Sequence, residues 1–170
     1  MKDKKRYYGK YRGTVLQNID TQKIGRLLVQ VPDVLGPGIS SWAMPCLPMA
    51  GMQAGMFVIP PMQSGVWVEF EQGDPDYPIW VGAFWGNAGE VPAMAQAVAP
   101  AVGVIALQTQ LQNTLILSDM PGIGGFQLMT TSKAMIQVND TGIIISNGKG
   151  ASIVMTGNTV AINGVALVVS

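Results

Sequence analysis

The chain has 170 residues, with ten basic side chains, ten acidic side chains and a hydrophobic share of 48%. Zero net charge and only 12% charged residues exclude a strongly basic nucleic-acid-binding chain and a charge-rich disordered one. With no histidine and one cysteine, Ser-His-Asp and Cys-His catalysis, zinc sites with histidine ligands and an intrachain disulfide are also excluded.

Residues 1–9 are predicted to form a basic N-terminal tail. Six basic residues fall within positions 1–12, against the single acid Asp3. No apolar run follows the tail, so we expect no signal peptide. No stretch of 18 apolar residues occurs anywhere, so we expect no membrane-spanning helix.

Residues 10–86 alternate between short β-type segments and turns rich in proline and glycine. In the segment 65–71, Val66, Val68 and Phe70 alternate with Trp67 and two glutamates, as in a strand with one buried face. About five short strands in fewer than 80 residues predict a small closed barrel of the OB (oligonucleotide/oligosaccharide-binding) type. The tryptophans at 67, 80 and 85 are expected in the barrel core or at a trimer interface, and Cys46 is expected to be buried.

Residues 87–107 are rich in alanine, proline, glycine and valine and are predicted to be an extended or irregular linker. From 108 to 170 the sequence has another rhythm, with six short apolar segments at 125–131, 134–139, 142–147, 152–157, 159–164 and 165–170. Asparagine, aspartate or glycine separates them, and they recur every eight to ten residues. The pattern predicts short stacked strands.

The C-terminal segment is too poor in charge for the surface of a monomer, since residues 91–170 carry only four charged side chains. Two arrangements would bury its apolar residues: a single-chain β-helix, or three interwound chains that each give one strand per level. A single-chain coil needs about 20 residues per turn, so residues 108–170 would form barely three turns. We therefore favour the intertwined trimeric β-helix. The predicted trimer core consists of Ile136, Val138, Ile144, Val154, Val160 and Ile162.

Five methionines crowd the proline-broken stretch before residue 65 and have two interpretations, core filler or an adaptable contact with a hub protein or another subunit. They are Met44, Met49, Met52, Met56 and Met62. Glu69 and Glu71 have the spacing of two carboxylates on one strand face, but a solvated surface pair explains them better than a glycosidase site. No catalytic residue, metal site or cofactor is expected.

Several motifs resemble the OB domain of phage baseplate assembly protein V and of the spike proteins of contractile injection systems. They begin at Tyr11, Ile24, Ser41, Gly55 and Val66, and they fall in the order found in that family. The most specific is the turn that follows Val66–Glu71, formed by Gly73, Asp74, Pro75, Asp76 and Pro78. The resemblance covers about residues 9–86, while 108–170 resembles the trimeric β-helix spikes only in architecture.

This resemblance implies a structural, non-enzymatic homotrimer in the baseplate of a phage tail or of an extracellular or cytoplasmic injection particle. We expect no hub domain fused in front of the OB domain, unlike in VgrG spikes, so the OB domain would lie under a separate trimeric tail hub. The β-helix would be the membrane-puncturing needle, capped by a PAAR-type tip protein or left bare.

An OB-fold binding module for single-stranded nucleic acid or glycan is the alternative function. Tyr7, Tyr8 and Tyr11 lie among basic residues, and OB folds use such aromatic and cationic side chains to bind bases. The acidic residues 69–76 and the lack of basic residues from 27 to 132 argue against a nucleic-acid groove. We therefore expect no nucleic-acid partner.

Overall fold

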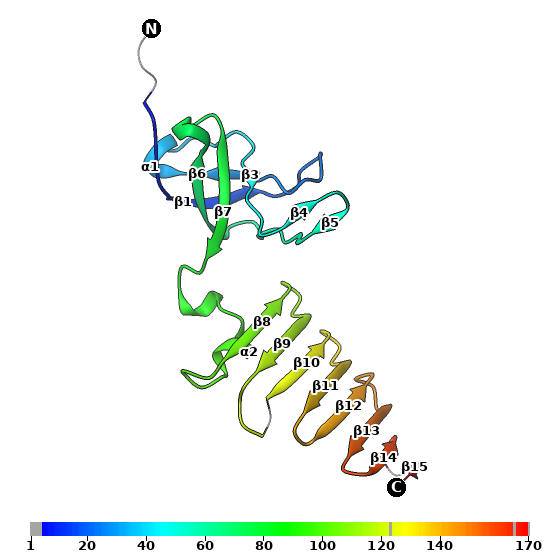
Figure 1. The fold of residues 1–170 in the computed structure, drawn as a ribbon. Coiled ribbons are helices and arrows are strands. Elements are labelled where there is room, and N and C mark those ends of the chain that lie inside the picture. Colours follow the sequence, from blue (N-terminus) through cyan, green and yellow to red (C-terminus); the bar gives the residue numbers. More distant parts are fainter. Residues whose placement is uncertain (1–4, 123, 165, 170) are drawn as a thin grey trace. The chain divides into compact units, whose positions relative to one another are not determined.

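The computed structural model describes residues 5–122, 124–164 and 166–169. The chain divides into two compact units, an N-terminal unit (Met1–Ala88) and a C-terminal unit (Gly89–Ser170). In both units the regular secondary structure is mainly β-strand, with a few short helical turns (Figure 1). The predicted all-β class is therefore confirmed.

The N-terminal unit contains a curved five-stranded sheet in the order β2-β1-β6-β7-β3 and a separate hairpin, β4-β5. Its pairs are antiparallel except for β3, which lies parallel to β7. The elements are β1 (Tyr11–Gln17), β2 (Leu28–Gln30), α1 (Pro32–Leu35), β3 (Met44–Pro45), β4 (Ala50–Gly51), β5 (Ala54–Gly55), β6 (Gly65–Phe70), the 3-10 turn η1 (Glu71–Gly73) and β7 (Pro78–Phe84).

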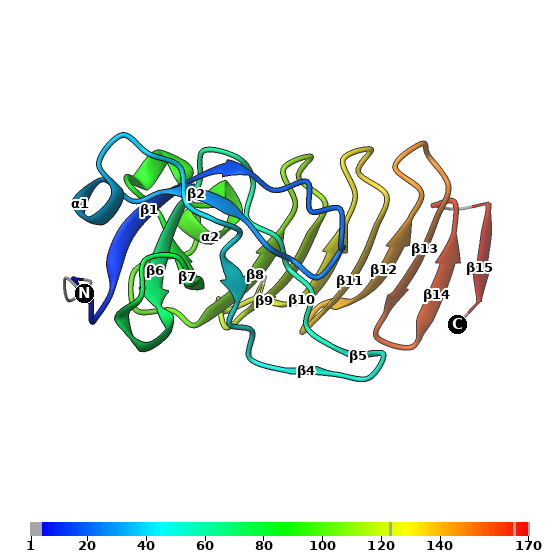
Figure 2. The ribbon, with the colours of Figure 1, turned by 90° about the horizontal axis from the view of Figure 1, so that it is seen from above.

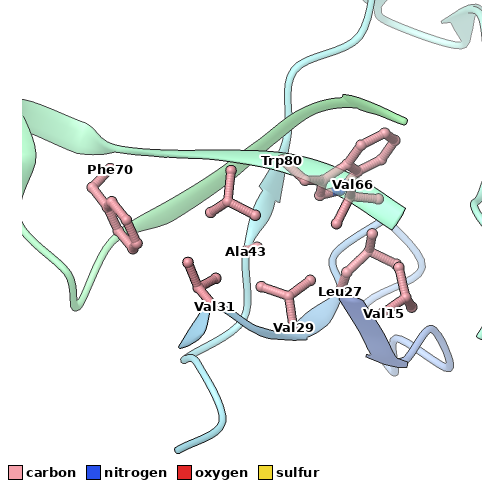
Figure 3. Packing of buried hydrophobic residues seen from close by; sticks show 9 residues of the cluster. Val15, Leu27, Val29, Val31, Ala43, Val66, Phe70 and Trp80 are labelled. Atoms are coloured by element: carbon pink, nitrogen blue, oxygen red, sulfur yellow. The ribbon is translucent and has the colours of Figure 1, made fainter. Parts of the chain in front are cut away.

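The core of this unit is a single cluster formed by every second residue of its strands. Figure 3 shows the side chains of this cluster in close packing. Val66 and Val68 are fully buried and Phe70 is 6% exposed, which confirms the alternation predicted for residues 65–71. The remaining members of the cluster are Val15, Leu27, Val29, Val31, Ala43 and Trp80.

The tryptophans expected in the core or at an interface occupy different environments. Trp80 is 4% exposed, and its indole Nε1 donates a hydrogen bond to the Gly25 carbonyl at 2.9 Å. Trp67 lies half-buried on the outer face of β6, with the Arg12 guanidinium over its ring, and Trp85 is 61% exposed. Of the three, only Trp80 belongs to the buried cluster.

The expectation that Cys46 is buried is wrong, because its side chain is exposed. β3 lies at the edge of the sheet, paired only with β7, and side chains alternate along this extended segment. Met44 and Cys46 therefore point outward, while Pro45 and Leu47 are half-buried. The Cys46 backbone N–H still donates to the Trp80 carbonyl, which ties this segment to the sheet.

The C-terminal unit is an eight-stranded sheet in which β8 to β15 follow one another in sequence order, as both views show (Figure 1 and Figure 2). Its elements, with the helical turns that precede them, are η2 (Ala88–Glu90), α2 (Ala93–Gln96), β8 (Val104–Gln108), β9 (Thr114–Ser118), β10 (Gly125–Met129), β11 (Met135–Asn139), β12 (Gly142–Ser146), β13 (Ser152–Thr156), β14 (Thr159–Ile162) and β15 (Leu167–Val169).

The six strands predicted for residues 125–170 correspond to β10–β15. Two more strands, β8 and β9, precede them. β8 begins inside the segment 87–107 that was expected to be a linker, because Val104–Leu107 pairs with β9 in antiparallel fashion. All pairs are antiparallel between consecutive strands, so each described strand takes its backbone hydrogen bonds from its own chain. The short strands that we expected to stack on one another therefore pair in sequence order within a single chain.

Candidate functional site

One face of the C-terminal sheet is formed only by apolar side chains. Residues paired across antiparallel strands project to the same side, and successive residues project to opposite sides, so the registers define this face. We call it the apolar face; its described members are Ile105, Leu107, Leu115, Leu117, Phe126, Leu128, Ile136, Val138, Ile143, Ile145, Ile153, Met155, Val160, Ile162 and Leu167.

The apolar face is open in the single chain. Ile105 is 63% exposed and Leu107 is 59% exposed, and exposure continues through Ile145 at 39% to Leu167 at 53%. A soluble protein rarely leaves so long a row of aliphatic side chains in water. This face therefore has the character of an interface that other chains complete.

The opposite face, here called the mixed face, alternates between polar and apolar residues. Thr114, Ile116, Gln127, Gln137 and Ser146 are among its members. The chain covers part of this face itself, because Met94, Ala97 and Val98 line a pocket together with residues 116, 127 and 137. Ile116 is 6% exposed as a result. Partial cover by its own chain thus distinguishes the mixed face from the apolar face, most of whose described members are exposed.

The six predicted core residues divide between these faces. Ile136, Val138, Val160 and Ile162 lie together on the apolar face. Ile144 and Val154 pair with each other on the mixed face, so the six cannot line one common core.

The sequence alone did not decide which residues of these strands face which side of the sheet. Three consecutive isoleucines (143–145) and the run Ile153-Val154-Met155 offer an apolar residue to either face. The pairing of Ile136 with Ile145 shows which residues share a face with Ile136. It adds four residues to the apolar face: Ile143, Ile145, Ile153 and Met155. Sequence reasoning missed these four residues.

The five methionines singled out in the sequence are all exposed, from 46% for Met44 to 97% for Met52. The structure brings Met49, Met52 and Met56 together on the hairpin of β4 and β5, where the Met56 backbone N–H donates to the Met49 carbonyl. Met44 lies on β3, and Met62 lies in the turn before β6. The exposure rules out core filling as the role of these side chains.

The turn that carries the family motif anchors the N-terminal segment. Gly73 has a φ of 76°, and its carbonyl accepts a hydrogen bond from the Tyr7 backbone N–H at 2.9 Å. A Cβ at this position would lie 3.0 Å from the Tyr8 ring, so glycine is required by both conformation and space. The Asp74 carboxylate accepts from the Asp76 backbone N–H within the turn, and Pro78 begins β7.

Most aromatic and basic side chains near the N-terminus contact the N-terminal unit, whereas Tyr8 is 72% exposed. The Tyr7 and Tyr11 rings pack against Phe70, with centroids 6.2 and 5.8 Å away. Lys10 Nζ lies 2.6 Å from the Glu69 carboxylate. Glu69 thus has a cation partner, and the described residues contain no cluster of three or more acidic, cysteine or histidine side chains fit for a metal ion.

An ion pair organises the loop between β1 and β2. The Arg26 guanidinium donates two hydrogen bonds to the Asp20 carboxylate, at 2.7 and 3.1 Å. Backbone N–H groups of Gln22, Ile24 and Arg26 donate to the same carboxylate. The Arg26 bond above all, with these N–H groups, holds the pKa of Asp20 well below its ordinary value despite partial desolvation.

Replacing Asp20 by asparagine is expected to destabilise the N-terminal unit at about pH 7 and to remove part of its acid sensitivity. Because the folded-state pKa is lowered, the carboxylate stabilises the fold above pH ~4, and the stabilisation is lost as the pH falls toward the folded pKa. Urea unfolding at about pH 7 and about pH 2.5, followed by tryptophan fluorescence, measures the effect. Asp33→Asn, on exposed α1, is the control, and equal pH dependence in D20N and the parent would contradict the assignment.

Two family models match the chain in the order of its two units. A type VI secretion system/phage-baseplate injector OB domain matches residues 11–85, from the start of β1 to just beyond β7. A phage baseplate V C-terminal trimerisation domain matches residues 104–168, from the start of β8 into β15. No curated protein matches the sequence. No helix in the described part of the chain is long and apolar enough to cross a membrane.

Proposed function

Because the chain belongs to the phage baseplate V family and has a structural role in a baseplate, we propose that it is the homotrimeric central spike of a contractile tail or related injection device. The family assignment rests on an OB domain followed by a trimerisation domain, which confirms the resemblance found in the motifs. The members of these families are structural baseplate proteins. The finer role, attachment under a tail hub and membrane puncture, is the content of the proposal.

The apolar face is the observation that carries this proposal. Three copies with their apolar faces turned toward a common axis bury fifteen described aliphatic or aromatic side chains from each chain. Full burial of one such side chain contributes about 1.5–3 kcal/mol, so even partial burial of this set exceeds the entropic cost of association. The mixed face, with its threonines, serines and glutamines, is then left for solvent wherever residues 94–98 do not cover it.

The resulting rod suits a mechanical task. Seven steps between eight strands, at about 4.8 Å each, give a three-sided prism about 34 Å long. Backbone hydrogen bonds within each sheet and apolar contacts between sheets both resist bending. We infer that sheath contraction pushes this prism, with a PAAR-type protein at its C-terminal end, into the target membrane, while the OB end joins the trimeric hub.

The tail contacts do not favour nucleic-acid binding as a second function. Base stacking needs accessible aromatic faces next to free cations. Tyr8 is 72% exposed, but Tyr7 and Tyr11 pack on Phe70. The neighbouring cations are paired, Arg6 with Asp74 and Lys10 with Glu69. These residues stabilise the N-terminal unit.

Light scattering after size exclusion tests the trimer. Three chains of 18.0 kDa give about 54 kDa, and this mass should persist on dilution because the interface is a hydrophobic core. A monodisperse particle of 18.0 kDa would refute the proposal. For the puncturing step, contractile particles assembled without this chain should contract but fail to release dye from vesicles made of target-cell lipids.

A further inference from the structure

We propose that the hairpin of β4 and β5 docks on the OB domain of the neighbouring copy within the trimer. This inference rests on the proposed homotrimer and names a second contact in it, separate from the apolar face. The hairpin comprises residues 48–58 and is here called the methionine hairpin. Figure 1 shows it extending from the five-stranded sheet.

The methionine hairpin has the surface of an interface core. All eleven of its residues are exposed, and Gln53 is its one polar side chain. Met52 is 97% exposed at the tip, and Phe57 is 65% exposed on the returning arm. From Val34 to Val68 the sequence has no charged residue, so no charge interrupts this surface. Exposed apolar surface of this extent is typical of protein–protein contacts.

Contacts at the base of the hairpin hold it in its exposed position. Leu47 and Ile59, which flank it, pack against the core cluster. The Asn18 side-chain amide donates to the carbonyl of the buried Pro60 at 3.1 Å. At the far side, a Cβ on Gly55 would lie 2.7 Å from the Met49 carbonyl oxygen, so glycine permits the close crossing of the two arms. A preordered hairpin loses little entropy on docking.

The loop between β1 and β2 widens the apolar surface beside the hairpin. The Phe57 ring and the Ile59 side chain both approach Gly25, which lies in the loop fixed by Asp20 and Arg26. Ile24, next to Gly25, is 44% exposed. The docking surface therefore combines the hairpin with this ordered loop.

A second copy fits this surface better than a separate protein does. Residues 104–168 form a trimerisation domain, so three N-terminal units are joined to one trimer through the short segment 89–103. Such a tether gives an effective concentration in the millimolar range, which makes even a modest apolar contact form. In a ring of three, each hairpin can contact the next unit, and the heterologous contact closes. The contact also removes an uncharged surface from solvent in the free trimer.

Site-specific photo-crosslinking in the full-length protein tests the contact. With p-benzoylphenylalanine replacing Met52, illumination of the purified protein should give covalent products of about 36 and 54 kDa, two and three times the 18.0 kDa chain. The same probe replacing Asp33 on α1, at the other end of the unit in Figure 1, should give about tenfold less product. Mass spectrometry should place the crosslinked residue within 5–88 of another copy.

A second substitution checks that the hairpin surface itself makes the contact. Met56→Asp, added to the Met52 probe, should reduce crosslinking about tenfold, whereas Met56→Leu should preserve it. Both changes are at an exposed position, so the fold is retained.

Each other outcome refutes the docking proposal, and the outcomes show whether the spike function fails with it. A trimer by light scattering that gives no crosslink refutes hairpin docking and leaves the spike function intact. Crosslinks to residues 104–169 place the hairpin on the rod, and a yield that rises with protein concentration indicates contact between separate trimers; either result refutes docking on the neighbouring OB domain. A monomer without crosslinks refutes both the docking and the spike.

Discussion

Replacing Ile145 by aspartate is expected to abolish the trimer. Ile145 lies in the middle strands of the apolar face, paired with Ile136 and Ile153. Three carboxylates would meet near one axis, and burying an ionised group without a partner costs several kcal/mol for each ion. Light scattering should show a shift from about 54 kDa to the 18.0 kDa chain.

Ile144→Asp is the matched control, since it makes the same chemical change one residue away on the same strand. Ile144 projects to the mixed face, beside Gln137 and Val154, where solvent can reach a carboxylate. This variant should remain trimeric. Loss of the trimer in I144D with retention in I145D would mean that the mixed face forms the core.

Replacing Leu27 by alanine is expected to destabilise the N-terminal unit by about 2–5 kcal/mol while leaving the trimer mass unchanged. Leu27 is fully buried in the core cluster, and its removal leaves a cavity that the short strands close only in part. All four tryptophans lie between residues 42 and 85, so tryptophan fluorescence during urea unfolding reports on this unit alone.

The neighbouring Leu28→Ala provides the control for this experiment. Leu28 is only half-buried on β2, so truncation should cost about 1 kcal/mol or less. Equal effects of L27A and L28A would contradict the observed inward direction of Leu27. A fall in trimer mass in L27A would mean that the trimer depends on the folded OB domain.

The sequence predicted those parts of the fold that depend on local pattern. Alternation in residues 65–71 predicted that Val66, Val68 and Phe70 share one face of a strand, and this face is the buried one. Regular spacing of short apolar segments and polar turns identified β10–β15. Both signals arise from the two-residue period of a strand, which one chain segment displays without reference to its neighbours.

Features that depend on pairing were beyond reach of the sequence. The run 143–145 has isoleucine at every position, so only the register with β11 shows that Ile145 lies on the apolar face and Ile144 on the mixed face. Cys46 was expected inside because free cysteine is usually buried, but the edge position of β3 turns it outward. The strand β8 could not be recognised in its alanine- and valine-rich segment, because it is defined by its pairing with β9.

The order of the strands in the C-terminal sheet also determines how this unit can fold. Because each strand pairs with the next one along the chain, the contact order of this sheet is low, and folding can propagate hairpin by hairpin. No chain has to thread through another. Formation of the sheet is then a first-order process within one chain, and only the association of three chains depends on protein concentration.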